Sequence, residues 1–232
     1  ILAPTRELAI QINESIRKYG HYAGVKHTVV FGGVKEGPQV KSLALGVDII
    51  VATPGRLLDL VNQGVCSLNQ VQFFVLDEAD RMLDMGFISD VEKVIELLPK
   101  QRQTLFFSAT MPESVIKFSK NILKSPVKVK VKSMLTPAER MSQSVIVIEP
   151  QDKVLQLITL LKDKVFESVI VFTRTKHKAN RICKKLINVG IQTEAIHSNK
   201  SQAARQRALN SFKDGEIKTL IATDIAARGI DI

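Results

Sequence analysis

The sequence of 232 residues has no tryptophan, only two cysteines and an aromatic content of 5%. Cys66 and Cys183 lack the close spacing of metal ligands, so we expect two packing residues in a reducing compartment. No stretch approaches the ~20 apolar residues of a membrane span. The first residues also lack the basic and apolar regions of a signal peptide. These absences exclude a disulfide scaffold and predict a cytoplasmic protein without a membrane partner.

Positive charge is the dominant feature of the composition. The formal net charge is +10 and the sequence pI is about 9.6, while 45% of the residues are hydrophobic, as in an ordinary globular core. Such a charge favours a polyanionic partner. Charge alone decides little, because many basic proteins bind no polyanion.

Short apolar runs alternate with stretches of helical length. The runs that we expect to form strands are residues 28–31, 48–52, 73–76, 104–107, 145–148, 169–172, 193–196 and 219–222. Runs that are apolar on both faces are typical of parallel sheets covered by helices on each side. Residues 152–162 have apolar side chains at helical spacing. The alternation predicts an α/β fold with two parallel-sheet domains.

The strand–helix rhythm breaks between residues 124 and 143. Ser125-Pro126 is followed by a Val/Lys alternation over residues 127–132, which predicts an edge strand with outward lysines. Polar residues and a further proline follow before the rhythm restarts. We therefore expect a first domain over residues 1–134, a linker over 135–143 and a second domain over 144–232.

Asp77 and Glu78 follow the apolar run at residues 73–76. Carboxylates at the carboxyl edge of a parallel sheet lie where ligands bind. In nucleotide hydrolysis, one acid there can hold Mg²⁺ and its neighbour can activate the attacking water. The alternative is that Asp77 or Asp80 only caps the next helix.

Ser108 and Thr110 follow the run at residues 104–107 in the same manner. Their hydroxyls are placed to hydrogen-bond the carboxylates at the tip of the neighbouring strand. A plain helix entry, with Thr110 as a cap and Pro112 in the first turn, is the alternative.

Three loops of the first half suit a phosphodiester backbone: Pro4-Thr5-Arg6, Gly32-Gly33 and Thr53-Pro54-Gly55-Arg56. Helix N-termini with threonine and arginine bind phosphate, and glycine allows a ligand close to the main chain. Each loop singly is also compatible with ordinary turn chemistry. Because all three follow apolar segments, we expect them to share one edge of the sheet and one anionic partner.

The second half repeats this arrangement. Thr173 and Arg174 follow an apolar run and begin a stretch rich in Lys and Arg, which is either a solvated helix face or a set of phosphate contacts. Gln202 and Arg205 lie one helical turn apart, and Thr223 opens a polar segment that contains Gly229 and Asp231. None of the four histidines stands in a recognisable catalytic pattern, which favours structural or solvated roles for them.

Taken together, these segments resemble the ordered motifs of the DEAD-box RNA helicases. The resemblance rests on residues 4–9 (motif Ia), 32–33 (GG), 53–56 (motif Ib), 77–80 (motif II), 108–110 (motif III), 169–173 (motif IV), 202–205 (QxxR) and 223–231 (motif V). Residues 199–212 and His177 look most like the bacterial RhlE-type subgroup. Ser198 stands where the family commonly has glycine.

The resemblance implies two RecA-like domains, with ATP between them and RNA across both. Asp77 would hold Mg²⁺ through water, Glu78 would activate the hydrolytic water, and Ser108 and Thr110 would couple the nucleotide to strand separation. Gly229 and Asp231 would approach the nucleotide. The implied RNA-backbone contacts are Pro4, Thr5, Arg6, Gly32, Gly33, Thr53, Pro54, Gly55, Arg56, Thr173, Arg174, Gln202, Arg205 and Thr223.

Two parts of such an enzyme are absent from the printed sequence. No Gly-x-x-x-x-Gly-Lys-Ser/Thr loop is present, and the segment from Gly32 to Gly37 has no lysine after it. The arginine-rich motif VI, which would supply the arginine finger, is absent too. We expect the chain to start at motif Ia and stop within motif V, and to hydrolyse ATP negligibly by itself.

Two other functions are compatible with parts of the pattern. An ATP-independent RNA clamp would need the basic loops but not the intact Asp77, Glu78, Ser108 and Thr110. A DNA helicase of a neighbouring superfamily is disfavoured by the combination of residues 53–56 with 223–231. The predicted function is therefore an ATP-dependent RNA helicase core with little sequence specificity.

Overall fold

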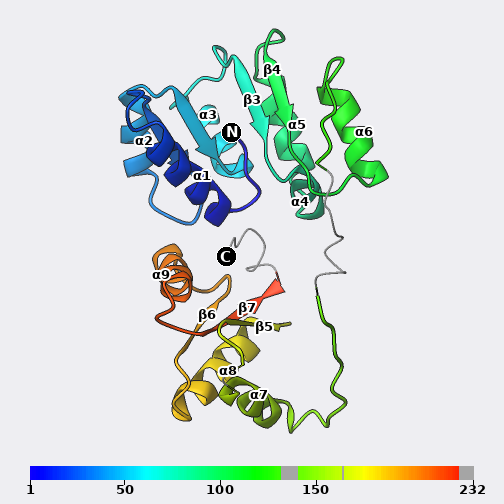
Figure 1. The fold of residues 1–232 in the computed structure, drawn as a ribbon. Helices are drawn as coiled ribbons and strands as arrows, with labels where there is room; N and C mark the ends of the chain where they lie inside the picture. The colour runs from blue at the N-terminus through cyan, green and yellow to red at the C-terminus, as the bar shows by residue number, and fades with distance from the viewer. Residues whose placement is uncertain (132–140, 164, 225–232) are drawn as a thin grey trace.

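The computed structural model describes residues 1–131, 141–163 and 165–224. Two groups of helices and strands lie one above the other in Figure 1. The first group comprises α1 (Arg6–Tyr19), β1 (His27–Val30), α2 (Gly37–Ala44), β2 (Ile49–Ala52), α3 (Pro54–Asn62), β3 (Phe73–Leu76), α4 (Ala79–Asp84), α5 (Ile88–Glu96), β4 (Gln103–Phe106) and α6 (Glu113–Ile122). The second comprises α7 (Lys153–Lys162), β5 (Val169–Thr173), α8 (Lys176–Asn188), β6 (Thr193–Ile196), α9 (Gln202–Lys213) and β7 (Thr219–Thr223).

The sheet of the first half is joined at its centre by residues 1–3. Strands β1 and β2 pair in parallel, as do β3 and β4. Leu2 forms parallel bridges to both Ala52 and Leu76. Its N–H donates to the carbonyl of Val75 over 2.8 Å, and the N–H of Ala3 donates to the carbonyl of Ala52 over 2.9 Å. These bonds make one parallel arrangement out of the two strand pairs.

Helices cover both faces of this sheet because successive side chains of a strand point to opposite faces. Helix α1 packs through Ala9 on the face that carries Ala3 and Val51. The opposite face carries Leu2, Ala52 and Leu76, which pack with residues of α3, α4 and α5. The apolar runs of the sequence are therefore buried from both sides, as the parallel-sheet pattern predicts.

The second half has a three-stranded parallel sheet in the order β5-β7-β6. On one face Ile196 and Leu220 pack with Leu209 and Phe212 of α9. On the other face Ala195 and Ile221 pack with Ala179 and Leu186 of α8. The central strand β7 is buried over residues 219–222.

Most predicted elements are confirmed. Every strand that the structure describes was predicted to within about one residue of its bounds. The helix predicted over residues 152–162 is α7. The α/β class with parallel sheets flanked by helices is confirmed as well. Among the described residues, no helix is both long and apolar enough to cross a membrane.

Two predicted strands are wrong. Residues 145–148 form no strand, and Val145 and Val147 are 91% and 94% exposed. Residues 127–131 of the predicted lysine-flanked edge strand form no strand either, while Lys132 lies outside the described residues. An alternating or apolar run makes a strand only where a neighbouring strand offers a hydrogen-bonding ladder, and none of the described strands lies beside these segments.

Candidate functional site

The predicted site residues of the first half lie at one edge of its sheet. Because the strands are parallel, their carboxyl ends meet at the same edge, where ligands of open α/β sheets bind. Thr5 follows the segment at residues 1–3, Thr53 follows β2, Asp77 follows β3 and Ser108 follows β4. The topology therefore brings four separate motifs to one edge.

Asp77 lies at the tip of β3 with its carboxylate half-buried. Its Oδ1 accepts a hydrogen bond from the backbone N–H of Glu78 over 2.9 Å. Burial raises the pKa of Asp77 above its ordinary value. In the part of the chain that the structure describes, Asp77 forms no ion pair, so its carboxylate is available to a cation.

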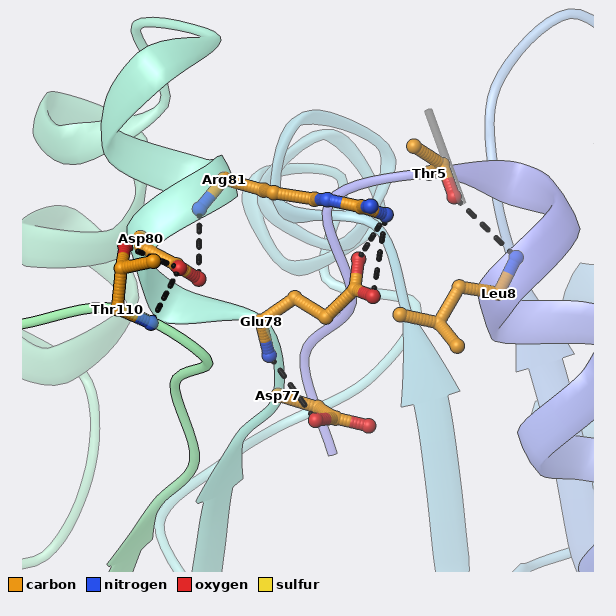
Figure 2. Close-up of polar contacts among 7 residues, drawn as sticks. All are labelled: Thr5, Leu8, Asp77, Glu78, Asp80, Arg81 and Thr110. Carbon is orange, nitrogen blue, oxygen red and sulfur yellow. Dashed lines mark hydrogen bonds and ion pairs between the residues drawn. The ribbon is translucent and has the colours of Figure 1, made fainter. Parts of the chain in front are cut away.

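Glu78 has a left-handed backbone, with a φ of 51° and a ψ of 50°. A non-glycine residue in this region is strained, and such residues are frequent at functional sites. The carboxylate turns toward Arg81, whose Nη1 donates to Oε1 over 3.1 Å and to Oε2 over 2.9 Å (Figure 2). Burial raises the pKa of Glu78, and the Arg81 guanidinium opposes that shift.

Asp80 connects the tips of β3 and β4. Its Oδ2 accepts from the backbone N–H of Thr110 over 2.9 Å and from the Thr110 hydroxyl over 2.7 Å (Figure 2). Burial alone would raise the pKa of Asp80, but the hydrogen bonds from Thr110, together with those from Ser108 and the Arg81 N–H, outweigh burial and lower it. The predicted bond from Thr110 to a carboxylate is thus confirmed, whereas the Ser108 hydroxyl donates to the carbonyl of Thr110 over 2.6 Å.

The capping alternative for the two aspartates is not what the structure shows. Glu78 is the N-cap residue of α4, and no side chain forms a capping hydrogen bond there. The carboxylates of Asp77 and Asp80 each accept a hydrogen bond from the next residue's N–H.

A groove of about 480 Å³ lies between the two halves of the chain. Pro4, Thr5, Arg6, Glu7, Gly32, Thr53, Gly55, Arg56, Met85 and Phe87 line it from the first half, and Arg174, Lys176, Ser198, Arg205 and Thr223 from the second. Five of these residues are Lys or Arg and only one, Glu7, is acidic. A groove with this excess of cations suits a phosphate-bearing ligand.

Thr5 and Arg6 form the wall of the groove at the start of α1. The Thr5 hydroxyl caps this helix by accepting from the N–H of Leu8 over 3.2 Å (Figure 2). Gly33 has a φ of +79°, and a Cβ atom there would overlap the Arg6 guanidinium. Gly33 therefore makes room for the Arg6 side chain. Burial lowers the pKa of Arg6, and the nearby Arg205 lowers it further.

Arg56 enters the groove from the first turn of α3, which begins at Pro54 after Thr53. Its Nη2 donates to the carbonyl of Val34 over 3.4 Å, and its Nε lies 3.6 Å from Asp59 Oδ2. The remaining nitrogen, Nη1, is buried and has no hydrogen-bond partner among the described residues. A buried guanidinium nitrogen without a partner is uncommon in proteins, so Arg56 is a candidate for a ligand contact.

In the second half, only part of the predicted set lines the groove. Arg174, Arg205 and Thr223 do, while Thr173 is buried with its hydroxyl donating to the carbonyl of Thr175 over 3.3 Å. Across both halves, the predicted RNA contacts that do not line the groove are Gly33, Pro54, Thr173 and Gln202. Gly229 and Asp231 lie outside the described residues.

Gln202 and Arg205 contact the other half of the chain. Gln202 Nε2 donates to Glu7 Oε1 over 2.9 Å, and Arg205 Nη2 lies 2.9 Å from the same oxygen. The sequence predicted RNA contacts for both residues. That prediction is untested, but these two side-chain nitrogens have a protein partner.

Comparison with known families identifies the protein family to which the chain belongs. The family model described as DEAD/DEAH box helicase matches residues 1–118, and the model described as helicase conserved C-terminal domain matches residues 152–232. The chain belongs to the DEAD/DEAH box helicase family.

Several members of this family align with the whole chain. DEAD-box ATP-dependent RNA helicase 20 of Oryza sativa subsp. japonica is 42% identical over 234 residues, which are 100% of this chain and 47% of that protein. The DEAD-box ATP-dependent RNA helicase CshA of Streptococcus pneumoniae is 40% identical over 232 residues, which are 100% of this chain and 44% of that helicase. The chain thus spans about half the length of the curated relatives it matches.

Solved structures of S. cerevisiae Dbp5 match the fold over the whole chain. S. cerevisiae Dbp5 bound to RNA and ADP BeF3 gives a TM-score of 0.81 at 30% identity, with 59% of that chain covered. A Dbp5 variant bound to Gle1 and IP6 gives 0.71 at 31% identity, with 57% covered.

Sequence reasoning missed two residues of this site, Glu7 and Arg81. Glu7 stood inside a quoted motif but was given no role of its own, because a motif does not show which side chain faces a partner. Lys176 belonged to the basic stretch after Arg174, for which phosphate contacts were one of two alternatives. Arg81 carried a signal, since it stands three residues after Glu78, and residues at that spacing face each other on a helix.

We predict that Thr110→Val destabilises the protein at neutral pH by about 1–2 kcal/mol, because it removes a hydroxyl donor to the Asp80 carboxylate. The hydrogen bonds to Asp80 hold its pKa below the ordinary value, so the charged form contributes stability above the unfolded-state pKa and loses it as pH falls through the folded-state pKa. The difference between variant and wild type should shrink in acid. Urea unfolding at about pH 7 and about pH 3 measures it.

Thr159→Val is the matched control, because the Thr159 hydroxyl donates only to the carbonyl of Leu155 in its own helix. A Thr110→Val deficit no larger than that of Thr159→Val, or one independent of pH, would contradict the role of the Asp80–Thr110 hydrogen bond.

Proposed function

We propose that this chain is the RNA-gripping and carboxylate-bearing part of an ATP-dependent RNA helicase. The observation that carries the proposal is the basic groove to which both halves contribute. Its walls hold Arg6 and Arg56 from the first half and Arg174 and Lys176 from the second. A single-stranded nucleic acid that follows this groove contacts both halves at once.

The two yeast comparisons support this reading. Dbp5 is the same protein in both structures apart from one substitution, and the identity to this chain is nearly the same, 30% and 31%. The TM-score is higher for the complex with RNA and ADP BeF3, 0.81 against 0.71. The structure of this chain is therefore more similar to the complex that holds RNA.

Contacts with the sugar–phosphate backbone explain binding without sequence preference. Helix α1 begins beside Thr5 and helix α3 beside Thr53, so their first N–H groups point toward the edge where a phosphate would lie. Arg6, Arg56 and Arg174 add guanidinium donors. We propose backbone contacts for the lining residues Pro4, Gly32, Gly55, Arg205 and Thr223 too. The other predicted contacts do not line the groove, and we propose that they support the lining residues from behind: Gly33, Pro54, Thr173 and Gln202.

Asp77 and Glu78 are the proposed hydrolytic residues. Mg²⁺ is commonly held by one or two carboxylates, with water and phosphate oxygens as its other ligands. The Asp77 carboxylate at the sheet edge, which forms no ion pair with any described residue, fits such a role through water. When bound, ATP would supply the phosphoryl group and Mg²⁺ would neutralise phosphate charge. Glu78 would accept a proton from the attacking water once its carboxylate has separated from Arg81. Gly229 and Asp231 are the proposed nucleotide contacts of the second half.

Thr110 and Ser108 are the proposed link between hydrolysis and RNA. Asp80 and Thr110 tie the tip of β3 to the tip of β4, and Ser108 fixes the same turn through the Thr110 carbonyl. A change at Asp77 or Glu78 would therefore reach the segment after β4.

Three finer features belong to the same proposal. We place the domain boundary at residues 135–143, between a first domain at 1–134 and a second at 144–232. The two unpaired cysteines support the cytoplasm as the compartment. His177 and residues 199–212 support the bacterial RhlE-type subgroup, although the relatives described above come from rice and Streptococcus.

We predict that the chain binds oligouridine with an affinity that falls steeply between about 50 and 200 mM salt, because phosphate contacts release counterions. Arg56→Ala should weaken binding and lower the log–log salt slope by about one. Arg17→Ala, in the last turn of α1 and outside the groove, is the matched control. Fluorescence anisotropy at several salt concentrations measures both quantities. A flat salt response, or equal effects of the two variants, would argue against the groove as the RNA site.

The enzymatic part of the proposal is testable in a chimera in which this chain replaces the 232 aligned residues of Streptococcus pneumoniae CshA. We expect RNA-stimulated phosphate release from the chimera, its loss in Glu78→Gln, and none from the chain alone. RNA should stimulate more than DNA of the same sequence. A chimera that binds RNA but releases no phosphate would favour the ATP-independent clamp, and stronger stimulation by DNA would favour a DNA helicase.

A further inference from the structure

The side chain of Gln39, in the first turn of α2, holds the main chain at the end of β1. Its Oε1 accepts from the N–H of Phe31 over 3.1 Å, and its Nε2 donates to the carbonyl of the same residue over 3.1 Å. Gln39 is 7% exposed and does not line the groove. A side-chain amide that makes both bonds replaces the peptide group that a neighbouring strand would offer. Gln39 therefore fixes the residue that directly follows β1.

The three residues after Phe31, residues 32–34, form a short segment that we call the glycine loop. Gly33 in this loop lies against the guanidinium of Arg6, because a Cβ atom there would overlap it. The next residue, Val34, accepts a hydrogen bond at its carbonyl from Arg56 Nη2 over 3.4 Å. Arg6 belongs to α1 and Arg56 to α3, and both line the groove. The glycine loop is thus the place where two groove arginines from different helices meet.

These two arginines need a support that keeps them together. Burial lowers the pKa of Arg6, and the charges of Arg205 and Arg56 lower it further, while Glu7 raises it. Like charges repel each other, so the two guanidinium groups would separate without a scaffold. Two successive glycines are a weak scaffold by themselves, because glycine has the largest conformational freedom of any residue. The anchor at Phe31 removes part of that freedom.

We propose that Gln39 is a positioning residue of the RNA site, which fixes the glycine loop so that Arg6 and Arg56 face one RNA strand together. Gln39 acts through the loop and needs no contact with RNA. This inference rests on the proposed RNA-binding function. It gives a role in binding to α2, although no residue of that helix lines the groove.

The test variant is Gln39→Met, which keeps the length of the side chain and removes both hydrogen-bonding groups. Ser119→Ala is the matched control for lost stability. Ser119 is buried in the same half, and its hydroxyl donates to the carbonyl of Ile116 over 2.8 Å within α6, which does not line the groove. Anisotropy measures the affinity for oligouridine, hydrogen exchange of the RNA-free chain measures opening of the glycine loop, and urea unfolding measures the stability of each variant.

Gln39→Met should weaken oligouridine binding by about tenfold and speed amide exchange in the glycine loop, whereas Ser119→Ala should change neither. In an Arg6→Ala background, the further loss from Gln39→Met should be about threefold or less, because the loop then has only Arg56 to hold. In an Arg174→Ala background the loss should stay near tenfold, because Arg174 belongs to the other half and does not touch the loop. A general loss of stability would instead weaken binding equally in both backgrounds.

Gln39→Glu probes the same two bonds with little change of shape. Its charged carboxylate would accept from the Phe31 N–H but have no proton to donate to the Phe31 carbonyl. The protonated form would make both bonds, and burial favours that form by raising the pKa of a carboxyl group. Relative to wild type at the same pH, the affinity of Gln39→Glu for oligouridine should be lowest at about pH 8 and recover toward about pH 5. This variant carries the test where Gln39→Met fails to fold.

Four results would overturn the role of Gln39. They are a loss of affinity in Gln39→Met no larger than in Ser119→Ala, unchanged exchange in the glycine loop, equal losses in the two arginine backgrounds, and no recovery of Gln39→Glu in acid. A failure of the proposed function looks different: the wild type would not bind oligouridine, while exchange in the glycine loop would still report whether Gln39 fixes it.

Discussion

The site depends on a few backbone hydrogen bonds made by residues 1–3. Leu2 lies between β2 and β3 and donates to the carbonyl of Val75, while its own carbonyl accepts from the N–H of Asp77 over 3.0 Å. This short segment fixes the register of two strand pairs that otherwise share no ladder. Because it leads directly into Thr5, Arg6 and Glu7, the same bonds place the proposed phosphate-binding loop beside the proposed hydrolytic carboxylates.

The acidic residues at this edge of the sheet differ in their burial and in their protein partners. Asp77 is free of ion pairs among the described residues, Glu78 is held by Arg81, and Asp80 is fixed by Thr110. Glu7 is buried among cations and faces the other half of the chain. The sequence places all four at the same sheet edge, but their partners decide which acid is available to a ligand and which ones hold the structure together.

Much of the fold was predictable from sequence, because buried parallel strands leave continuous apolar runs such as residues 73–76 and 219–222. The two wrong strands, at 127–132 and 145–148, show the limit of that signal, since a run cannot reveal whether a neighbouring strand exists. The site residues were predictable where a motif follows a strand. The contacts of Glu7 and Arg81, and the packing of the Arg6 guanidinium against Gly33, could not be predicted. They depend on which side chains meet after folding.

Hydrogen exchange with and without oligouridine tests the central claim, that one RNA strand contacts both halves through the ends of their helices. The claim predicts slower amide exchange at residues 4–8 and 53–57 of the first half and at residues 173–178 of the second, all in the same complex. Helix α6, Glu113–Ile122, does not line the groove and should exchange at an unchanged rate. Protection confined to one half, or protection equally strong in α6, would contradict it.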